Sequence, residues 1–346
     1  MNPFYSIVCP VYNSSAYLEQ NLLNLLSNVF RDFEIIIVDD GSSDNTFSIC
    51  SELSKKDKRL KVFKKGNEGP LIARAFGANH CIGNYILFLD SDDRFTDNGL
   101  NDLHDFIIES NFPDFVVFDV KCKKTNQNFF IKTLNSANSQ CFEDCLFLKK
   151  CLLENKINGL YFKCFKNINF IFNLDELREK NALIEEDLIM SAILFDQYHN
   201  SAYYKKAIYE YTYRPGSLMN KSFVADMDLY VNKYTIDFLL NYSKNWDLYD
   251  SCFLNIIATN LLAVLSFVHK CYFFMNWNSC KLCFEKQVFV SPGFKYYFKY
   301  EKMLKKNLNF SQRKELNLLA KRQYLFLYLR FLFSKTKYKM IRLLKK

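Results

Sequence analysis

The sequence predicts an α/β fold, with a mostly parallel sheet in the first 220 residues and a helical region after it. In the first part, apolar runs of strand length alternate with helix-length segments, and two of the runs end in clustered acidic residues. Alternating strands and helices are typical of a parallel sheet with right-handed crossovers. With 346 residues, 49% of them hydrophobic, the chain can hold one large domain and a smaller appendage.

Five apolar runs are expected to form the strands, at residues 5–9, 34–38, 60–63, 85–89 and 115–120. Helical patterns precede the second to the fifth run, at about residues 17–28, 46–55, 72–81 and 99–110. The chain must turn at Pro10, because proline cannot continue a central strand. Ser14 or Ser15 is expected to cap the first of these helices. Ser43 or Asp44 is expected to cap the second.

Acidic residues follow two of the predicted strands. Asp39 and Asp40 end the second strand, and the run Asp90-Ser91-Asp92-Asp93 follows the fourth. Ligands of open α/β sheets bind outside the carboxyl ends of the strands, so the two acidic ends are expected to meet at one crevice. Clustered carboxylates repel one another, and Mg²⁺ or Mn²⁺ relieves that cost while also binding phosphate. Taken alone, the run at residues 90–93 is equally typical of a solvated turn.

Three strings carry a resemblance to a known family: residues 6–13 (SIVCPVYN), 38–44 (VDDGSSD) and 83–93 (GNYILFLDSDD). In this order and spacing they resemble the family 2 glycosyltransferases, and residues 67–69 with Arg74 resemble a further block of that family. The resemblance covers about the first 215 residues. It implies a GT-A fold, which is a Rossmann-like nucleotide-sugar transferase fold, in an enzyme of bacterial surface-polysaccharide assembly.

The resemblance also implies a nucleoside pocket at the carboxyl edge of the sheet. Pro10 and Tyr12 would line this pocket. Asp40 matches the acidic residue that accepts a hydrogen bond from uracil in this family, and Asp39 is close enough to share that work. These matches favour a UDP-sugar as the donor.

The same resemblance implies a site for the diphosphate and its metal ion. Asp92 matches the metal-ligand position of the family's DXD motif, and Asp90 would contact the ribose, the metal or a metal-bound water. Mn²⁺ or Mg²⁺ is the expected ion. Arg74 is expected to pair with the diphosphate, because a guanidinium suits phosphate geometry. A surface arginine on a helix is an equally good interpretation of Arg74.

A downstream acidic motif supplies a candidate catalytic base. Residues 184–190 (IEEDLIM) resemble the Glu-Asp motif of the family. By that match Asp187 accepts the proton of the acceptor hydroxyl and Glu186 supports it, in an inverting transfer. Taken alone, the motif is more typical of a helix start, since acidic residues favour a helix N-terminus.

Two further segments resemble parts of the family. Residues 160–166 (LYFKCFK) resemble the segment before the base, and Lys163 matches a lysine that often lies near the acceptor, although the usual neighbouring tryptophan is absent. Residues 211–218 (YTYRPGSL) resemble the closing motif, in which Arg214 or Ser217 would touch the donor. A turn at a domain boundary is an equally good interpretation of this second segment.

Basic residues are concentrated near the C-terminus. Residues 313–346 carry 11 Lys and Arg and one acidic residue, whereas the formal net charge of the whole chain is +9. Interleaved basic and apolar residues at the end of this tail are typical of a helix on an anionic membrane surface. A packing helix with a solvated basic end is the alternative. The rest of the chain is not basic and carries no nucleic-acid-binding motif, so nucleic acid is not an expected partner.

Cysteine usage and hydropathy bear on location. The 12 cysteines are scattered, which suits a reducing cytoplasm, and the single CxxC of Cys280 and Cys283 is not expected to bind zinc. No signal-peptide pattern is visible, and no segment reaches the roughly 20 apolar residues of a spanning helix. The protein is therefore expected in the cytoplasm, peripherally bound to the inner face of the membrane.

Residues 1–220 are thus expected to form the GT-A domain, and residues 221–346 a helical region that shapes the acceptor site and contacts the membrane. The expected reaction transfers a hexose or N-acetylhexosamine to a surface glycan or lipid-linked oligosaccharide. One alternative is a catalytically inactive GT-A protein that binds nucleotide or glycan. A nucleotidyltransferase is a second, but the glycine-rich phosphate loop of those enzymes is replaced here by Pro10-Val11-Tyr12-Asn13.

Overall fold

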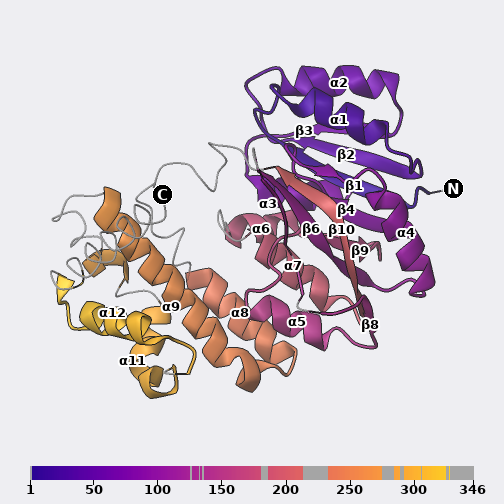
Figure 1. Ribbon diagram of the computed structural model, residues 1–346. Coiled ribbons are helices and arrows are strands. Elements are labelled where there is room, and N and C mark those ends of the chain that lie inside the picture. Colours follow the sequence, from indigo (N-terminus) through magenta and orange to yellow (C-terminus); the bar gives the residue numbers. More distant parts are fainter. Residues whose placement is uncertain are drawn as a thin grey trace. The chain divides into compact units, whose positions relative to one another are not determined.

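The computed structural model describes residues 2–124, 127–131, 133–134, 136–180, 186–212, 233–274, 284–288, 292–304, 306–324 and 327. The chain divides into two units, which Figure 1 shows coloured along the sequence. Unit 1 comprises Met1–Leu152 and Lys156–Asn220, and unit 2 comprises Leu153–Asn155 and Lys221–Lys346. Every candidate site residue that the structure describes lies in unit 1.

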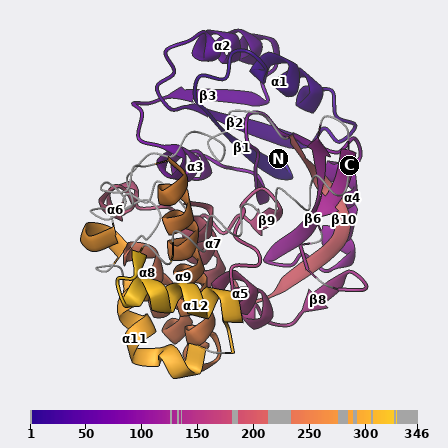
Figure 2. The same cartoon turned by 60° about the vertical axis from the view of Figure 1, so that its left-hand side comes forward.

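Unit 1 is built on one sheet with the strand order β3-β2-β1-β4-β9-β6-β10-β5, in which β7 pairs with β6 and β8 with β10. The strands are β1 (Tyr5–Val11), β2 (Phe33–Asp39), β3 (Leu60–Lys64), β4 (Tyr85–Phe88), β5 (Arg94–Phe95), β6 (Phe115–Lys124), β7 (Gln127–Ile131), β8 (Gln140–Phe142), β9 (Lys163–Lys166) and β10 (Ser201–Thr212). The long pairings β3–β2, β2–β1, β1–β4 and β6–β10 are parallel, which confirms the predicted α/β fold. The short strand β9 is antiparallel to β4 and β6. Figure 2 shows β6 and β10 side by side.

Helices cover both faces of this sheet. They are α1 (Leu18–Leu26), α2 (Thr46–Lys56), α3 (Pro70–Ala78), α4 (Gly99–Glu109), α5 (Leu146–Leu153), α6 (Leu174–Lys180) and α7 (Glu186–Asp196). Helix α3 packs on β1 and β2 through Gly77, where an added Cβ would lie 2.5 Å from Val8 Cγ1 and 3.2 Å from Val38 Cγ2. Cys50 of α2 lies near Asp39, whose side chain points away from the Val38 face because strand side chains alternate. Helices α2 and α3 therefore lie on opposite faces.

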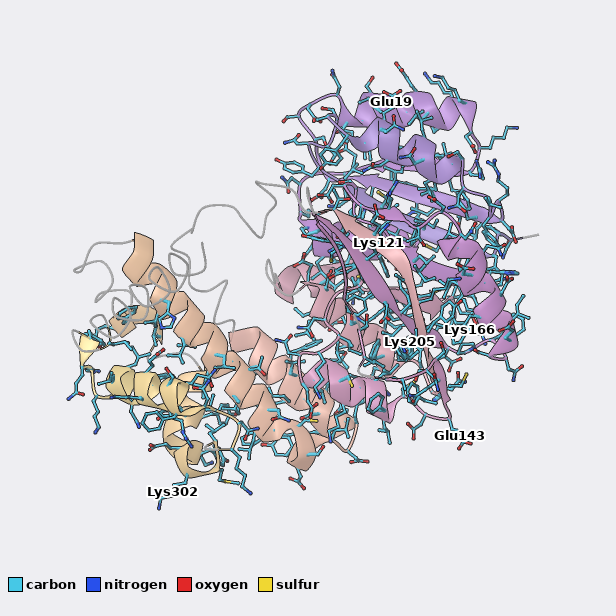
Figure 3. All side chains as sticks on the ribbon, in the orientation of Figure 1. Glu19, Lys121, Glu143, Lys166, Lys205 and Lys302 are labelled. Atoms are coloured by element: carbon cyan, nitrogen blue, oxygen red, sulfur yellow. The ribbon has the colours of Figure 1, made fainter. Side chains whose placement is uncertain are left out.

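The five predicted strands and four predicted helices of unit 1 are all present, with ends shifted by a few residues. The predicted turn at Pro10 is wrong, because β1 continues through Pro10, which is in register with Val38, and ends at Val11. The predicted cap of the first helix is wrong. The N-cap of α1 is Tyr17, without a side-chain cap, and the Ser14 hydroxyl instead donates to the Tyr12 carbonyl over 3.1 Å. The predicted cap of the second helix, Ser43 or Asp44, is also wrong, because the N-cap of α2 is Asn45 and has no side-chain cap. Asp44 lies one residue before it, and its Oδ1 accepts the Thr46 N–H over 3.0 Å. Charged side chains such as Glu143 point outward from unit 1 (Figure 3).

Unit 2 is helical over its described residues. It contains α8 (Lys233–Asn245), α9 (Tyr249–Phe274), the π-helix η3 (Phe284–Val288), α11 (Pro292–Leu304) and α12 (Phe310–Ala320). The long helix α9 packs against α8, α11 and α12 and buries apolar residues such as Ile257 and Leu261. Within the described part of the chain, no helix is both long and apolar enough to cross a membrane.

Candidate active site

The carboxyl ends of β1, β2 and β4 lie at one edge of the sheet. Val11 at the end of β1 is in register with Asp39 at the end of β2, and the Asp40 N–H donates to the Val11 carbonyl over 2.9 Å. Strand β4 pairs in parallel with β1 on its other side, so the turn that contains Asp90 leaves the same edge. The sheet therefore brings the turn after β1 and the two acidic strand ends together.

Asp40 anchors the loop that leads into α3. Its carboxylate accepts hydrogen bonds from the Gly69 N–H (2.7 Å), the Glu68 N–H (3.0 Å) and the Lys65 ammonium (2.7 Å). The residue is only 4% exposed. A carboxylate has about four lone-pair positions, and these three donors occupy three of them. A nucleobase could therefore bond to Asp40 only at the remaining position.

Asp39 is fully buried and shapes the turn after β2. Its Oδ1 accepts the Ser42 N–H over 3.0 Å, and its Oδ2 is buried without a hydrogen-bond partner. A side chain with no exposed surface cannot touch a ligand in this conformation, so the geometry does not support a contact between Asp39 and uracil. Gly41 completes the turn with φ +77°, and a Cβ there would lie 2.9 Å from the Asn67 nitrogen, so the turn requires glycine.

The turn after β1 offers an aromatic ring beside the Asp40 turn. Tyr12 is 50% exposed, and Pro10 is partly exposed. Asn13, at φ +46°, ties the two turns together, because its Oδ1 accepts the Ser43 N–H over 2.9 Å and its own N–H donates to Ser42 Oγ over 3.0 Å. An exposed tyrosine ring can pack against a nucleobase of any kind.

The acidic turn after β4 contains one buried and two partly exposed carboxylates. Asp90 and Asp92 are partly exposed, whereas Asp93 is buried and accepts hydrogen bonds from the Tyr209 hydroxyl (2.8 Å) and the Thr212 N–H (2.7 Å) of β10. Burial, followed by the nearby Asp90 carboxylate, raises the pKa of Asp93 to about 8. Asp93 therefore holds the turn against β10, whereas Asp90 and Asp92 keep part of their surface exposed.

Asp90 and Asp92 are the residues of this turn that could hold a divalent cation. No three His, Cys, Asp or Glu side chains are grouped as a complete metal site among the residues that the structure describes. Mg²⁺ usually needs only one or two protein carboxylates, because waters and substrate phosphates complete its coordination shell. Two partly exposed carboxylates therefore fit Mg²⁺ or Mn²⁺ bound together with a diphosphate.

Arg74 is the charge centre of the site. Its side chain, 8% exposed, forms ion pairs with Asp90 (2.7 Å), Asp187 (3.1 Å) and Glu186 (3.4 Å). Burial by itself lowers the pKa of Arg74, but the carboxylates of Asp187, Asp90 and Glu186 raise it, and the net shift is upward. Arg74 is thus not a surface arginine. A contact between Arg74 and a diphosphate would compete with three carboxylates that already surround the guanidinium.

Glu186 and Asp187 lie in the first turn of α7, and both contact Arg74. Their side chains are 22% and 25% exposed. Burial raises the pKa of both carboxyl groups, whereas the Arg74 guanidinium acts in the opposite direction. Asp187 Oδ2 also accepts the Leu160 N–H over 3.3 Å. A partly exposed carboxylate whose pKa is shifted toward neutrality is suited to accept a proton.

Lys163 is fully buried on β9, so in this conformation it cannot lie beside an acceptor as its motif implies. Its ammonium donates to the carbonyls of Ile157 (2.6 Å) and Gly159 and to Ser191 Oγ (3.1 Å). Burial lowers the pKa of Lys163 well below its usual value, while Asp187 acts in the opposite direction. Lys163 thus ties the loop before β9 to α7, next to the candidate base.

Comparison with known proteins identifies the family. The family model described as Glycosyl transferase family 2 matches residues 6–176. An uncharacterized glycosyltransferase of Haemophilus influenzae is 32% identical over 188 aligned positions, and the match covers 51% of this chain and 73% of that protein. This chain belongs to glycosyltransferase family 2.

Other glycosyltransferases match over part of their length. The GalNAc(5)-diNAcBac-PP-undecaprenol beta-1,3-glucosyltransferase of Campylobacter jejuni is 30% identical over 47% of this chain and 52% of that protein. The chain spans 18% of an uncharacterized glycosyltransferase of Rickettsia conorii, at 43% identity. Among solved structures, Staphylococcus aureus TarS 1–349 in complex with UDP-GlcNAc has a TM-score of 0.67 and 18% identity, covering 96% of this chain and 92% of that chain. This likeness supports the predicted GT-A fold.

Several predicted features of this glycosyltransferase lie outside the described residues. They are Arg214 and Ser217 of the closing motif, the CxxC of Cys280 and Cys283, and residues 328–346 of the basic tail.

Tyr209 is a site residue that no sequence motif indicated. Its hydroxyl accepts the Asp90 N–H over 3.2 Å and donates to Asp93, so it links β10 to the acidic turn. No local pattern distinguishes Tyr209 from the other tyrosines of β10, and only the pairing of distant strands identifies it.

Proposed function

We propose that this glycosyltransferase moves a hexose or N-acetylhexosamine from a UDP-sugar to a surface glycan or lipid-linked oligosaccharide, in a metal-dependent reaction that inverts the anomeric centre. The observation that carries the proposal is the position of Arg74. Its guanidinium contacts Asp90 of the acidic turn (2.7 Å) and Asp187 (3.1 Å), so the donor turn and the candidate base face one reaction centre. A general base must lie within reach of the hydroxyl that attacks the bound donor.

In this proposal Asp92 and Asp90 hold Mn²⁺ or Mg²⁺, an ion that would neutralise charge on the diphosphate when bound. Asp187 accepts the proton of the acceptor hydroxyl as that oxygen attacks the anomeric carbon. Glu186 shares the Arg74 guanidinium with Asp187. Burial and the Asp90 carboxylate raise the pKa of Asp187, which suits a base that must take up a proton.

The donor and acceptor are proposed from the pocket and from relatives. Pro10 and Tyr12 would contact the nucleoside, and Asp40 would accept the uracil N–H with its remaining lone pairs. Arg214 and Ser217 would close over the donor. UDP-GlcNAc is the ligand named for the TarS complex, which shares the fold. A lipid-linked acceptor is named for the Campylobacter relative.

Calorimetric binding of UDP tests the donor site. Wild-type protein is expected to bind UDP with Mn²⁺ and to lose most of that affinity in EDTA. Asp92→Asn removes a charged ligand of the ion and is expected to abolish the difference between Mn²⁺ and EDTA. Asp105→Asn is the matched control, because that side chain is 57% exposed on α4. A folded wild-type sample that binds no nucleoside diphosphate with metal would exclude the proposed function.

We also propose that the enzyme is cytoplasmic and binds the inner face of the membrane peripherally through its basic C-terminal part. Met303 and Phe310 flank the connection between α11 and α12, and they are 55% and 73% exposed. Lys302 and Lys306 beside them are exposed too, and Figure 3 shows Lys302 pointing outward. Exposed apolar side chains next to lysines suit the surface of an anionic bilayer.

Vesicle sedimentation tests this membrane contact. Phe310→Ser is expected to weaken binding to phosphatidylglycerol vesicles by roughly tenfold, because a large apolar side chain no longer enters the bilayer. Phosphatidylcholine vesicles are expected to bind little of either protein. Val29→Ser is the control, because Val29 is 70% exposed in unit 1. Equal binding of wild type and Phe310→Ser to the anionic vesicles would contradict a membrane contact at this connection.

A further inference from the structure

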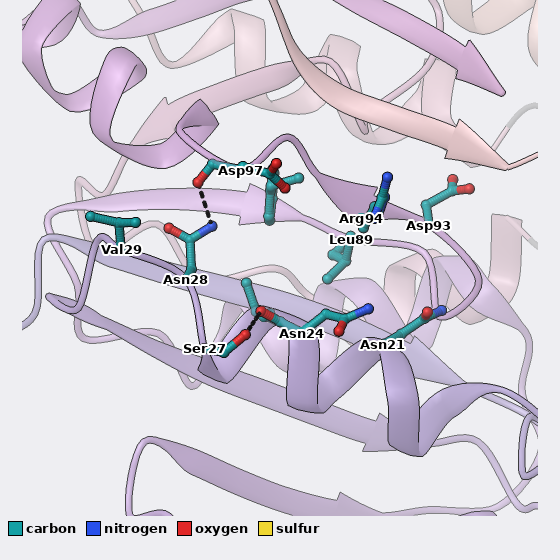
Figure 4. Close-up of a pocket in the computed structure, with 11 residues that line it drawn as sticks. Asn21, Asn24, Ser27, Asn28, Val29, Leu89, Asp93, Arg94 and Asp97 are labelled. Carbon is teal, nitrogen blue, oxygen red and sulfur yellow. Dashed lines mark hydrogen bonds between the residues drawn. The ribbon is translucent and has the colours of Figure 1, made fainter. Parts of the chain in front are cut away.

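Helix α1 holds the backbone of the acidic turn from one side. The Nδ2 of Asn21 donates to the carbonyl oxygen of Ser91 over 2.8 Å. Ser91 stands between Asp90 and Asp92, so this bond fixes the peptide unit that joins the two candidate metal ligands. Figure 4 shows Asn21 projecting from α1 at one side of a cavity, with Asp93 across from it.

The side chain of Ser91 is held by the turn proposed to line the nucleoside pocket. Ser14 Oγ lies 3.1 Å from Ser91 Oγ, and it donates to the Tyr12 carbonyl over 3.1 Å. The Tyr17 hydroxyl donates to Ser14 Oγ over 3.2 Å. Ser14 is 1% exposed, so these contacts form largely away from water, where hydrogen bonds are electrostatically stronger. The turn after β1, the start of α1 and the acidic turn are thus one hydrogen-bonded unit.

The acidic turn is also held from β10, but at other atoms. There the Tyr209 hydroxyl accepts the Asp90 N–H over 3.2 Å and donates to Asp93 over 2.8 Å. These bonds fix the first and last residues of the turn. The turn also closes on itself, because the Asp93 N–H donates to the Asp90 carbonyl over 3.0 Å. The carbonyl of the middle residue, Ser91, accepts its hydrogen bond from Asn21.

We infer that Asn21 is a positioning residue for the divalent cation of the donor site. Without the hydrogen bond from Asn21 to Ser91, a smaller fraction of molecules holds the carboxylates of Asp90 and Asp92 in position for one ion. Binding that depends on a preorganised pair of ligands weakens when that fraction falls. Contacts of the nucleoside with the turn after β1 do not depend on the ion. This inference rests on the proposed metal-dependent donor site.

The chain offers a matched control for Asn21. Asn24 lies three residues further along α1 and lines the same cavity of about 240 Å³. Its side chain accepts a hydrogen bond from Gln20 Nε2 over 3.0 Å. Asn24→Ala therefore removes an amide from the same helix and cavity without removing the bond to Ser91.

Calorimetric binding of UDP over a series of Mn²⁺ concentrations tests the inference with full-length protein. Asn21→Asp keeps the side-chain shape but places a carboxylate against the Ser91 carbonyl, and Asn21→Ala removes the side-chain donor. Each is expected to raise the Mn²⁺ concentration for half-maximal UDP binding by roughly three- to tenfold, the effect of one lost hydrogen bond. UDP affinity in EDTA is expected to stay at the wild-type value, and Asn24→Ala is expected to behave as wild type.

Three results would overturn the inference. In the first, both Asn21 variants need no more Mn²⁺ than the wild type. In the second, Asn24→Ala shifts the Mn²⁺ requirement as much as they do. In the third, UDP affinity in EDTA falls as much as affinity with Mn²⁺, which would indicate general damage to the nucleoside turn. Wild-type protein without Mn²⁺-dependent binding would instead refute the proposed function, and that result is known before any variant is compared.

Discussion

Replacing Asp187 with Asn is expected to reduce sugar transfer by about a hundredfold or more while UDP binding with Mn²⁺ stays intact. Asparagine keeps the size of the side chain but cannot accept the proton of the acceptor hydroxyl, and general-base catalysis contributes about 10²–10⁴ in rate. Donor binding should survive, because Arg74 keeps its ion pairs with Asp90 and Glu186. Turnover and calorimetry on the same preparation measure the two effects separately.

The pH dependence of turnover gives an independent check on Asp187. Burial raises the pKa of this carboxyl group, so the protonated, inactive form persists to higher pH than for an ordinary aspartate with a pKa of about 3.9. Turnover is expected to rise with pH through that raised pKa. Asp196→Asn, at the exposed end of the same helix, should keep the wild-type rate and profile. Transfer by Asp187→Asn at the parental rate would show that another group is the base.

Replacing Arg74 with Met is expected to destabilise unit 1 by about 3–5 kcal/mol, the cost of removing one partner of a buried ion pair. Asp90, Glu186 and Asp187 would be left as neighbouring negative charges without the cation between them. Metal-dependent binding of UDP should weaken as well, because the acidic turn loses its contact with α3. Thermal unfolding followed by circular dichroism measures the loss of stability.

The loss in Arg74→Met should depend on pH. Glu186 and Asp187 already have raised pKa values in the folded protein, and removing Arg74 takes away an interaction that lowers both. A carboxyl group with a higher pKa folded than unfolded binds more protons when folded, so stability falls as pH rises from the unfolded to the folded pKa. The variant should therefore approach wild-type stability in acid and fall furthest below it at neutral pH.

Arg178→Met is the matched control for Arg74→Met, because Arg178 forms ion pairs with Glu68 and Asp175 at an exposed position on α6. Its melting temperature should stay close to that of the wild type, since surface ion pairs contribute little. An Arg74→Met protein with the melting temperature of the wild type at neutral pH would mean that the guanidinium is not needed to stabilise the three carboxylates.

The first half of the fold could be predicted from local pattern because each strand there is a continuous apolar run followed by an amphipathic helix. Strands β9 and β10 could not be predicted in this way. β9 is four residues long with lysine at both ends, and β10 shows register shifts between Tyr204 and Tyr209 that break its alternation. Both are fixed by pairing with β4 and β6, which are distant in the sequence.

The acidic motifs predicted where candidate ligands gather, but they could not predict which side chain faces solvent. Asp39 and Asp40 are neighbours in the sequence, yet alternation along β2 turns Asp39 toward α2, and Asp40 reaches the loop before α3. The sequence alone left a surface position as an equally good interpretation of Arg74, because a helix always has an outer face. In α3 the residues on both sides of Arg74 are apolar and buried. This nearly continuous apolar sequence is the signal that indicates a buried position for Arg74.

The close packing of α3 on the sheet also constrains how this enzyme can change over evolution. Gly77 lies three residues after Arg74, on the same side of the helix, where no space exists for even one methyl group against Val8. Any larger residue would lift α3 and carry the guanidinium away from Asp90 and Asp187. The distances from Arg74 to Asp90 and Asp187 thus depend on how closely α3 packs against the sheet at Gly77, one turn further along the helix.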